Sequence, residues 1–354
     1  MARKFLTVLI VLPGLLVACS AYAAVETPVI ISDPAYTHAQ RLVAIEPGRK
    51  LNLYCIGKGS PTVIFDSGVT DETSVWGLVQ PVVSKHTRTC SHDRAGVGFS
   101  DPGNRASSSA NIVDDLHRLL VAAKIKPPYV LVGHSYGGMN IKLYASTYPS
   151  EVVGMVFVDP SHEDQKDGYR KLDPRQLSSA EWDRITIEPS LAKRRECIAA
   201  APAGFIPGTE LYKKCSFDPN PTFSVEINAI HLKIYLQQPF QQAQLSEEES
   251  IFAASADQVR AARRNLGDIP LIVLTQSPNT RPLPAGVTQE LRDARNNFWV
   301  SLHDDIASLS TQGVNRIVEK SGHNIPYDQP GVVNDAIFEV IKASKKYSRS
   351  GKRR

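Results

Sequence analysis

Runs of consecutive apolar residues constrain the fold of this chain more than any other feature. They read YVLVG at residues 129–133, VVGMVFV at 152–158 and PLIVL at 270–274. Strands that are apolar on both faces belong to sheets that are covered on both sides. Segments with helical spacing, such as residues 109–123, separate these runs. The alternation predicts an α/β fold with a mostly parallel, doubly wound sheet that carries helices on both faces.

One long segment, residues 161–267, departs from this alternation. It is polar and mostly helical in character, and SEEESIFAASADQVRAARRNL is its clearest helical stretch. Because it lies between two buried strands, we expect a helical lid inserted over the carboxyl edge of the sheet, where α/β folds bind ligands. The expected core then comprises residues 24–160 and 268–341, and residues 342–354 form a basic C-terminal tail.

The formal charge of +4 originates at the two ends of the chain. Arg3 and Lys4 lie at the start, and residues 342–354 carry seven basic residues and no acid. Removing these charges from +4 leaves −5 for residues 24–341. A mildly acidic body argues against a nucleic-acid partner. The motifs described below instead imply a small-molecule ester or amide substrate.

The N-terminal sequence MARKFLTVLIVLPGLLVACSAYAAVE is typical of a secretory signal. A basic start precedes a short apolar run, and Ala21-Tyr22-Ala23 fits a cleavage site. We therefore predict a signal peptide over residues 1–23, a periplasmic or secreted protein, and no transmembrane span after signal removal. Leu16-Val17-Ala18-Cys19 also resembles a bacterial lipobox, so the alternative is a membrane-anchored lipoprotein with a lipid anchor at Cys19.

Export changes how the cysteines are interpreted. Four remain after signal removal, and they are Cys55, Cys90, Cys197 and Cys215. An even number in an oxidising compartment favours disulfide bonds, and four cysteines allow three pairings. Four free buried thiols are the alternative, which fits only a cytoplasmic protein. Neither a Cys-x-x-Cys pair nor a histidine cluster accompanies them, so we expect no metal and no cofactor.

The segment PYVLVGHSYGGMNIKLY places one serine between a buried strand and a helix. Gly133-x-Ser135-x-Gly137 in this context is the signature of a nucleophile elbow. Such a turn projects the serine hydroxyl from the sheet edge, because glycines on either side let strand and helix approach closely. The start of the following helix also aims the Tyr136 N–H at the place where an oxyanion would form.

Four motifs in this order resemble the α/β-hydrolase family over roughly residues 45–341. Besides the serine turn, these are VIFDSGVTDETSVWGLV, HDRAGVGFSDP and SGHNIPYDQP. The first departs from the family's usual His-Gly pair, since Asp66-Ser67-Gly68 stands there. The resemblance implies an α/β-hydrolase fold with the segment 161–267 as its lid.

The resemblance also implies the roles of individual residues. Ser135 corresponds to the nucleophile and His323 to the general base, since a serine hydroxyl is a weak nucleophile until a base accepts its proton. The N–H of Val69 would be the second oxyanion donor beside that of Tyr136. In this topology the strands with Cys55 and Cys90 are neighbours, which implies a Cys55–Cys90 disulfide. The remaining pair, Cys197–Cys215, would then form a disulfide within the lid.

The catalytic acid is less directly indicated. The usual position follows IPLIVLTQS, but PNTRPLP contains no carboxylate. Some family members, including haloalkane dehalogenases, take the acid from the preceding strand, where Asp159 follows VVGMVFV. We therefore predict that Asp159 orients His323. Glu163 and Asp164 are the next candidates, and a strand-end aspartate that only caps a turn is the alternative for Asp159.

These residues predict a serine hydrolase that cleaves carboxylic esters through an acyl-enzyme intermediate. An aminopeptidase-type peptide or amide hydrolase shares the scaffold and usually needs acidic groups to hold the substrate amine. Glu247, Glu248 and Glu249 are available in the lid, although consecutive glutamates on a helix are expected to be solvated. A non-catalytic binding protein is the third hypothesis. An aspartate-nucleophile dehalogenase or epoxide hydrolase is excluded by Ser135.

Overall fold

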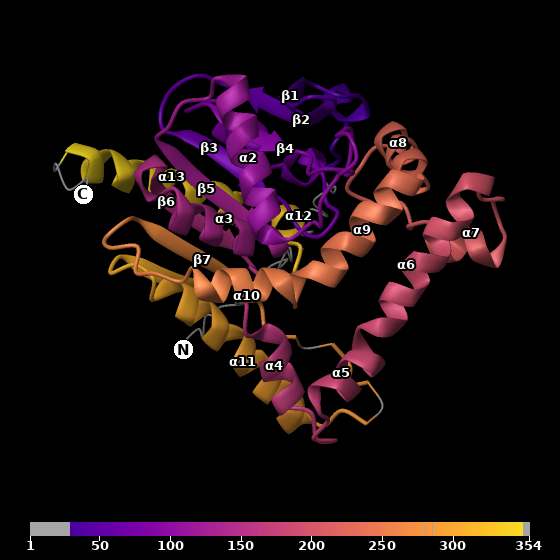
Figure 1. Ribbon diagram of the computed structural model, residues 1–354. Helices are drawn as coiled ribbons and strands as arrows, with labels where there is room; N and C mark the ends of the chain where they lie inside the picture. Colours follow the sequence, from indigo (N-terminus) through magenta and orange to yellow (C-terminus); the bar gives the residue numbers. More distant parts are fainter. Residues whose placement is uncertain (1–28, 280, 285, 350–354) are drawn as a thin grey trace, which may run out of the picture.

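The computed structural model describes residues 29–279, 281–284 and 286–349, so the predicted signal peptide and Cys19 lie outside the described residues (Figure 1). These residues form an eight-stranded sheet with the order β1-β2-β4-β3-β5-β6-β7-β8. The pairs β1/β2 and β2/β4 are antiparallel, and all the others are parallel. The strands are β1 (Leu42–Glu46), β2 (Arg49–Ile56), β3 (Thr62–Asp66), β4 (Thr89–His92), β5 (Tyr129–His134), β6 (Val152–Val158), β7 (Leu271–Gln276) and β8 (Gly313–Val318).

The position of each strand in the sheet follows from its sequence. Every residue of β3, β5 and β6 is buried, as their continuous apolar runs require in a sheet covered on both faces. By contrast, β8 alternates between exposed and half-buried residues over most of its length, which suits an edge strand. The predicted α/β fold with a mostly parallel, doubly wound sheet is confirmed.

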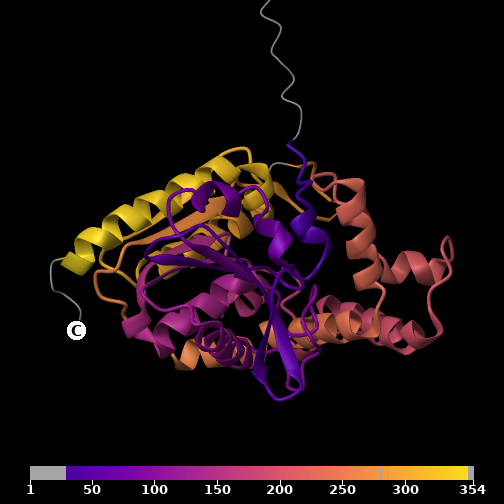
Figure 2. The same cartoon turned by 90° about the horizontal axis from the view of Figure 1, so that it is seen from above.

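Helices cover both faces of the sheet (Figure 1, Figure 2). On one face, residues of α2, α3, α10 and α11 share a core cluster with the sheet. On the other face, the cluster contains residues of α1 and α13, and the long helix α13 packs mainly against β6. The core helices, with 3-10 helices written η, are η1 (Pro34–Thr37), η2 (Thr73–Trp76), α1 (Gln80–Val83), α2 (Ser109–Ala123), α3 (Tyr136–Thr147), η3 (Pro149–Glu151), α11 (Gln289–Ala307), α12 (Ile325–Asp328) and α13 (Pro330–Arg349).

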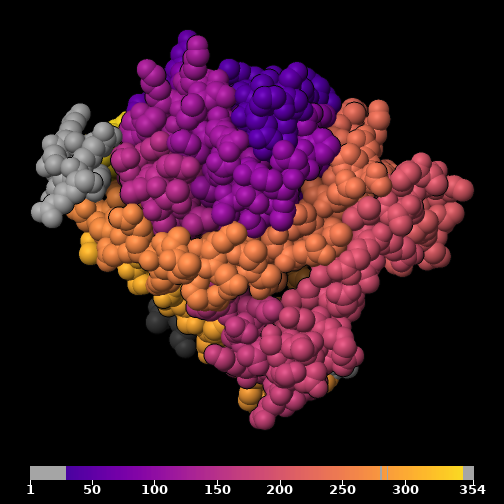
Figure 3. Space-filling model, in the orientation of Figure 1, coloured from indigo at the N-terminus to yellow at the C-terminus, as the bar shows by residue number. Residues whose placement is uncertain are grey.

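A helical insertion separates β6 from β7 and extends to one side of the sheet (Figure 1, Figure 3). Its helices are α4 (Gln165–Lys171), α5 (Ser179–Thr186), α6 (Glu188–Ala200), η4 (Ala201–Ala203), α7 (Glu210–Cys215), α8 (Val225–Tyr235), α9 (Gln238–Ile251) and α10 (Ala254–Ala261). The first described residues tie into it, because Ile31 N–H donates to Thr222 O at 2.7 Å and Ser224 N–H donates to Ile31 O at 2.9 Å. The insertion is therefore anchored to the N-terminal segment as well as to the core.

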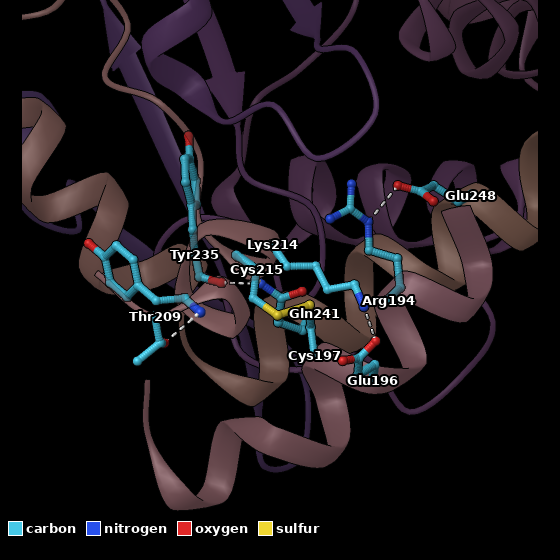
Figure 4. The surroundings of a disulfide bond; sticks show 10 residues. Arg194, Glu196, Cys197, Thr209, Lys214, Cys215, Tyr235, Gln241 and Glu248 are labelled. Atoms are coloured by element: carbon cyan, nitrogen blue, oxygen red, sulfur yellow. Dashed lines mark hydrogen bonds and ion pairs between the residues drawn. A yellow bond between two sulfur atoms is a disulfide. The ribbon is translucent and has the colours of Figure 1, made fainter. Parts of the chain in front are cut away.

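Two disulfides cross-link the structure. Cys55 and Cys90 face each other on the antiparallel strands β2 and β4. Cys197 and Cys215 join α6 to α7, and the ion pairs Arg194–Glu248 and Lys214–Glu196 surround this bridge (Figure 4). Closing a loop of 18 residues limits the unfolded chain and stabilises the folded state by about 3 kcal/mol. Two disulfides fit a protein outside the reducing cytoplasm.

The C-terminal helix is longer than its sequence pattern predicts. The apolar spacing indicates a helix over residues 331–344, whereas α13 continues to Arg349, into the segment expected to be a tail. Along residues 29–279, 281–284 and 286–349, we find no helix whose length and apolar character would let it cross a bilayer.

Candidate active site

The serine turn has the strained geometry of an elbow. Ser135 lies between β5 and α3 with φ 51° and ψ −120°, a conformation that side chains other than glycine rarely adopt. The turn also needs glycine on both sides. A Cβ on Gly133 would lie 2.5 Å from the carbonyl oxygen of Gly137, and one on Gly137 would lie 2.2 Å from that of Asp66. The close approach of β3, β5 and α3 therefore fixes where the serine hydroxyl emerges.

Asp159 and His323, which are 164 residues apart, are in direct contact. The Nδ1–H of His323 donates to Asp159 Oδ2 at 2.6 Å. Asp159 is fully buried at the end of β6, with the positive φ of 41°, and its other oxygen accepts from Gln276 N and Trp299 Nε1, each at 2.9 Å. A carboxylate held in this way keeps Nδ1 protonated and leaves Nε2 of the imidazole free to accept a proton.

His134 brings the serine turn next to the histidine loop. The rings of His134 and His323 lie 4.8 Å apart between centroids, and His134 Nε2 lies 2.9 Å from the carbonyl oxygen of His323. Within the described residues, the hydroxyl of Ser135 has no hydrogen-bond partner, and Ser135 is 9% exposed. In unliganded enzymes the hydrogen bond between a catalytic serine and its general base is often long, and it tightens when substrate binds.

The expected oxyanion donors lie on either side of the serine. Tyr136 is the first residue of α3, so its N–H has no acceptor within the helix. The Val69 N–H likewise has no acceptor among the described residues. Gly68 places this loop close to the serine, since a Cβ built on Gly68 would lie 3.4 Å from Cβ of Ser135. Two backbone N–H groups without an acceptor among the described residues thus lie near Ser135.

A buried ion-pair network holds the Val69 loop against the insertion. Arg94 donates to Asp66 Oδ1 at 2.8 Å and, through Nε, to Glu247 Oε1 at 2.6 Å. The same guanidinium binds the carbonyl oxygens of Ser67 and Gly68, and Glu247 Oε2 accepts from Thr70 N at 2.6 Å. Burial disfavours the Arg94 charge, but Glu247 and Asp66 outweigh burial and raise the pKa of Arg94. The network therefore clamps residues 66–70 on both sides of Val69.

The expectation that Glu247 is solvated is wrong. Its side chain is fully buried, whereas Glu248 and Glu249 form ion pairs with Arg194 and Arg195. A signal for this was present in the sequence, because Ala243 and Ile251 lie four residues before and after Glu247 and are buried on the same helix face. Arg94, in the HDRAGVGFSDP motif, was not singled out by the sequence reasoning.

The side chains of Trp76, His92 and His162 contact residues of the surrounding fold. Trp76 is fully buried, its ring is tilted by 39° against that of Phe65, and its Nε1–H donates to Ser67 Oγ at 2.9 Å. His92 lies 3.2 Å from the carbonyl oxygen of Phe65, and His162 lies 3.0 Å from Asp305 Oδ2. Sequence reasoning missed His303 and Trp299, both on α11, because nothing in the helical pattern distinguishes them as neighbours of Asp159.

A cavity of about 670 Å³ opens beside the site. Its lining includes Val69 and Asn324, which is next to His323, together with residues of η2, α7 and α8, but neither Ser135 nor His323 itself. This volume falls in the range of small-molecule sites. Among the described residues, no group of three or more His, Cys, Asp or Glu side chains is placed to hold a metal ion.

A mostly parallel sheet, a serine elbow after β5 and helices inserted after β6 define the α/β-hydrolase class. Residues 61–186 match the family model described as "alpha/beta hydrolase fold". The haloalkane dehalogenase DbeA-M1 loop variant from Bradyrhizobium elkanii superposes with a TM-score of 0.63 and 16% identity, covering 88% of this chain and 98% of that one, which shows the fold alone. The chain therefore has the α/β-hydrolase fold.

Two curated relatives are similar in sequence. The uncharacterised protein YqjL of Bacillus subtilis is 25% identical over 284 residues, which are 80% of this chain and 85% of YqjL. The 2-(acetamidomethylene)succinate hydrolase of Mesorhizobium japonicum is 30% identical over 103 residues. That match spans 29% of this chain and 37% of the relative, so it covers little more than a third of that enzyme.

The network around Glu247 predicts a difference between two adjacent glutamates. We expect Glu247→Gln to lower the free energy of unfolding by about 3 kcal/mol, because it leaves buried Arg94 with one carboxylate fewer. Glu248→Gln is the matched control and should cost less than about 1 kcal/mol, since its ion pair is partly exposed. Urea unfolding followed by circular dichroism measures both, and equal losses would contradict the assigned role of Glu247.

The buried His303 predicts a pH dependence of stability. Burial lowers its pKa from 6.5 to about 4, so between these pH values the folded protein binds fewer protons than the unfolded chain. The stability that His303 contributes is complete above pH 6.5 and is lost on acidification, by about 3 kcal/mol in total. Unfolding at pH 7 and pH 4 should therefore show a larger acid loss for the native protein than for His303→Asn. An identical loss in both proteins would refute this.

Proposed function

We propose that this protein is a serine hydrolase that cleaves carboxylic esters through an acyl-enzyme intermediate. The observation that carries the proposal is the 2.6 Å contact between Asp159 and His323, whose loop lies against His134, the residue before a serine held at an elbow. An oriented imidazole next to a projecting hydroxyl is the arrangement that activates a serine nucleophile. The α/β-hydrolase fold, and the match of residues 61–186 to its family model, support hydrolysis as the reaction class.

In this mechanism Ser135 Oγ attacks the carbonyl carbon of the substrate while His323 Nε2 accepts the hydroxyl proton. The tetrahedral oxyanion accepts hydrogen bonds from the N–H groups of Val69 and Tyr136. His323 then donates its proton to the leaving alcohol, which departs and leaves Ser135 acylated. A water molecule, deprotonated by His323, attacks the acyl-enzyme and releases the acid and free Ser135. Asp159 stabilises the imidazolium that forms in both steps.

An ester is preferred as the substrate bond because an alcohol leaves more easily than an amine. An aminopeptidase-type amide hydrolase is the second candidate, but the glutamates of α9 no longer favour it. Glu247, Glu248 and Glu249 are each engaged in ion pairs, so they are not free to hold a substrate amine. In either case we propose that residues 161–267 act as the lid over the site, and that the protein works in the periplasm or outside the cell.

The proposal predicts that Ser135 reacts with a fluorophosphonate probe. The native protein should be labelled and should hydrolyse p-nitrophenyl acetate, and Ser135→Ala should abolish both. Ser161→Ala is the control, because Ser161 lies near the elbow but has no role in the mechanism. An unlabelled native protein would favour a non-catalytic binding protein, and faster cleavage of amino-acyl p-nitroanilides than of esters would favour the amide hydrolase.

The role of Asp159 predicts a large kinetic effect of a nearly isosteric change. We expect Asp159→Asn to lower kcat for p-nitrophenyl acetate by about 10³- to 10⁴-fold with little change in KM, because the amide no longer fixes the imidazole tautomer. Trp299→Phe removes a donor to the other oxygen of the same carboxylate and should lower kcat by less than about tenfold. Near-native kcat in Asp159→Asn would move the catalytic acid to another residue.

A further inference from the structure

The cavity beside Ser135 has walls of two kinds. Carboxylates lie along the loop that follows β3, at Asp71 and Glu72, and again at Asp218 in the insertion. Aromatic side chains form much of the remaining wall, and they are Tyr212, Phe217, Phe223, Tyr235, Phe240 and Tyr327. Carboxylates and aromatic ring faces both attract a cation, and rings favour an organic cation over a small hydrated metal ion.

Asp71 is a carboxylate close to the proposed nucleophile. A Cβ built on Gly68 would lie 2.6 Å from Asp71 Oδ2 and 3.4 Å from Cβ of Ser135, so both flank the same residue. The Asp71 side chain is 40% exposed and lies 3.7 Å from His134 Nδ1. Among the described residues it has no lysine or arginine partner. It is therefore accessible to a positively charged group of a bound molecule.

Glu72, beside Asp71, lies in a buried position against His231 and Tyr235. Its side chain is 6% exposed, and its Oε1 atom lies 3.0 Å from His231 Nε2 and accepts from the Tyr235 hydroxyl at 2.9 Å. Its Oε2 atom is buried without a hydrogen-bond partner. Burial and the charges of Asp71 and Glu72 raise the pKa of the Tyr327 hydroxyl, which also lines the cavity.

The cations near this cavity are already engaged. Lys213, at its wall, pairs with Glu210 at 2.7 Å. Arg94 is held by Asp66 and Glu247 within the buried network. Among the described residues, therefore, no lysine or arginine neutralises the charge of Asp71. A positively charged ligand can do so.

From these contacts we infer that the cavity binds an organic ammonium group, and that the substrates of this enzyme carry such a group close to the scissile carbonyl. Asp71 contacts the ammonium, and the aromatic rings surround its alkyl substituents. Because Asp71 and Ser135 flank Gly68, the ammonium lies only a few bonds from the carbonyl that Ser135 attacks. The identification of the substrate class rests on the proposed hydrolase function, whereas the binding of the cation does not.

Binding is tested on the Ser135→Ala protein, which removes catalysis from the measurement. Isothermal titration with n-butylammonium and with butan-1-ol compares two probes of similar size that differ in charge. We expect n-butylammonium to bind about tenfold more tightly, and Asp71→Asn in the same background to remove most of that preference. Asp257→Asn, a change at an exposed carboxylate of α10 outside the cavity, should leave the preference unchanged. Equal binding of the two probes would overturn the inference.

Substrate preference is tested with p-nitrophenyl alaninate and p-nitrophenyl 2-methylpropanoate, in which an ammonium replaces a methyl group. The ratio of their kcat/KM values should fall about tenfold in Asp71→Asn, and comparing ratios cancels the intrinsic reactivities of the esters. Hydrolysis of both esters with an unchanged ratio would overturn the inference and leave the serine hydrolase intact. Failure to hydrolyse either ester, while n-butylammonium still binds, would overturn the proposed function and leave the cation site.

Discussion

The geometry of the site depends first on the hydrogen bond between Asp159 and His323, which several strands of the sheet hold in place. Asp159 ends β6, its Oδ1 is held by the N–H of Gln276 at the end of β7, and His323 follows β8. Parallel pairing of these three strands brings their carboxyl ends to one edge of the sheet. A shift in register at either pairing would separate the carboxylate from the imidazole, so the sheet order itself positions the proposed base.

The helical insertion also positions residues at this edge of the sheet, through a buried ion pair. Arg94 and Glu247 lie 153 residues apart, and together they hold the loop that carries Val69. A buried pair of this kind stabilises little by itself, because desolvation offsets most of the attraction. The ion pair instead fixes the conformation of the loop, because the carboxylate and the guanidinium can bind the backbone groups in only one arrangement. Docking of α9 and placement of the Val69 N–H are therefore coupled.

The sequence predicted the fold well because apolar runs and the serine turn are local patterns. The strands β5, β6 and β7 could be recognised from YVLVG, VVGMVFV and PLIVL, and the insertion from the loss of alternation between them. Ser135, His323 and Asp159 were selected from motifs, and the structure places the last two in contact. Asp71, Glu72 and Arg94 were not selected, because their importance arises from where the chain folds around them. Glu247 was misjudged, since the sequence EEE does not reveal which glutamate faces the core.

The proposed catalytic residues and the cavity wall come from different parts of the chain. The proposed nucleophile, base and backbone donors all lie at the ends of sheet strands or on the loops that directly follow them. The cavity wall instead combines the loop after β3 with α7 and α8, and the Cys197–Cys215 bridge fixes α7 directly before Ser216 and Phe217 of that wall. Changes in the insertion can thus alter which molecule is bound without disturbing Ser135 or His323. The cavity with its carboxylates and aromatic rings therefore bears on which molecule binds, whereas the proposed acyl-transfer residues bear on how that molecule is cleaved.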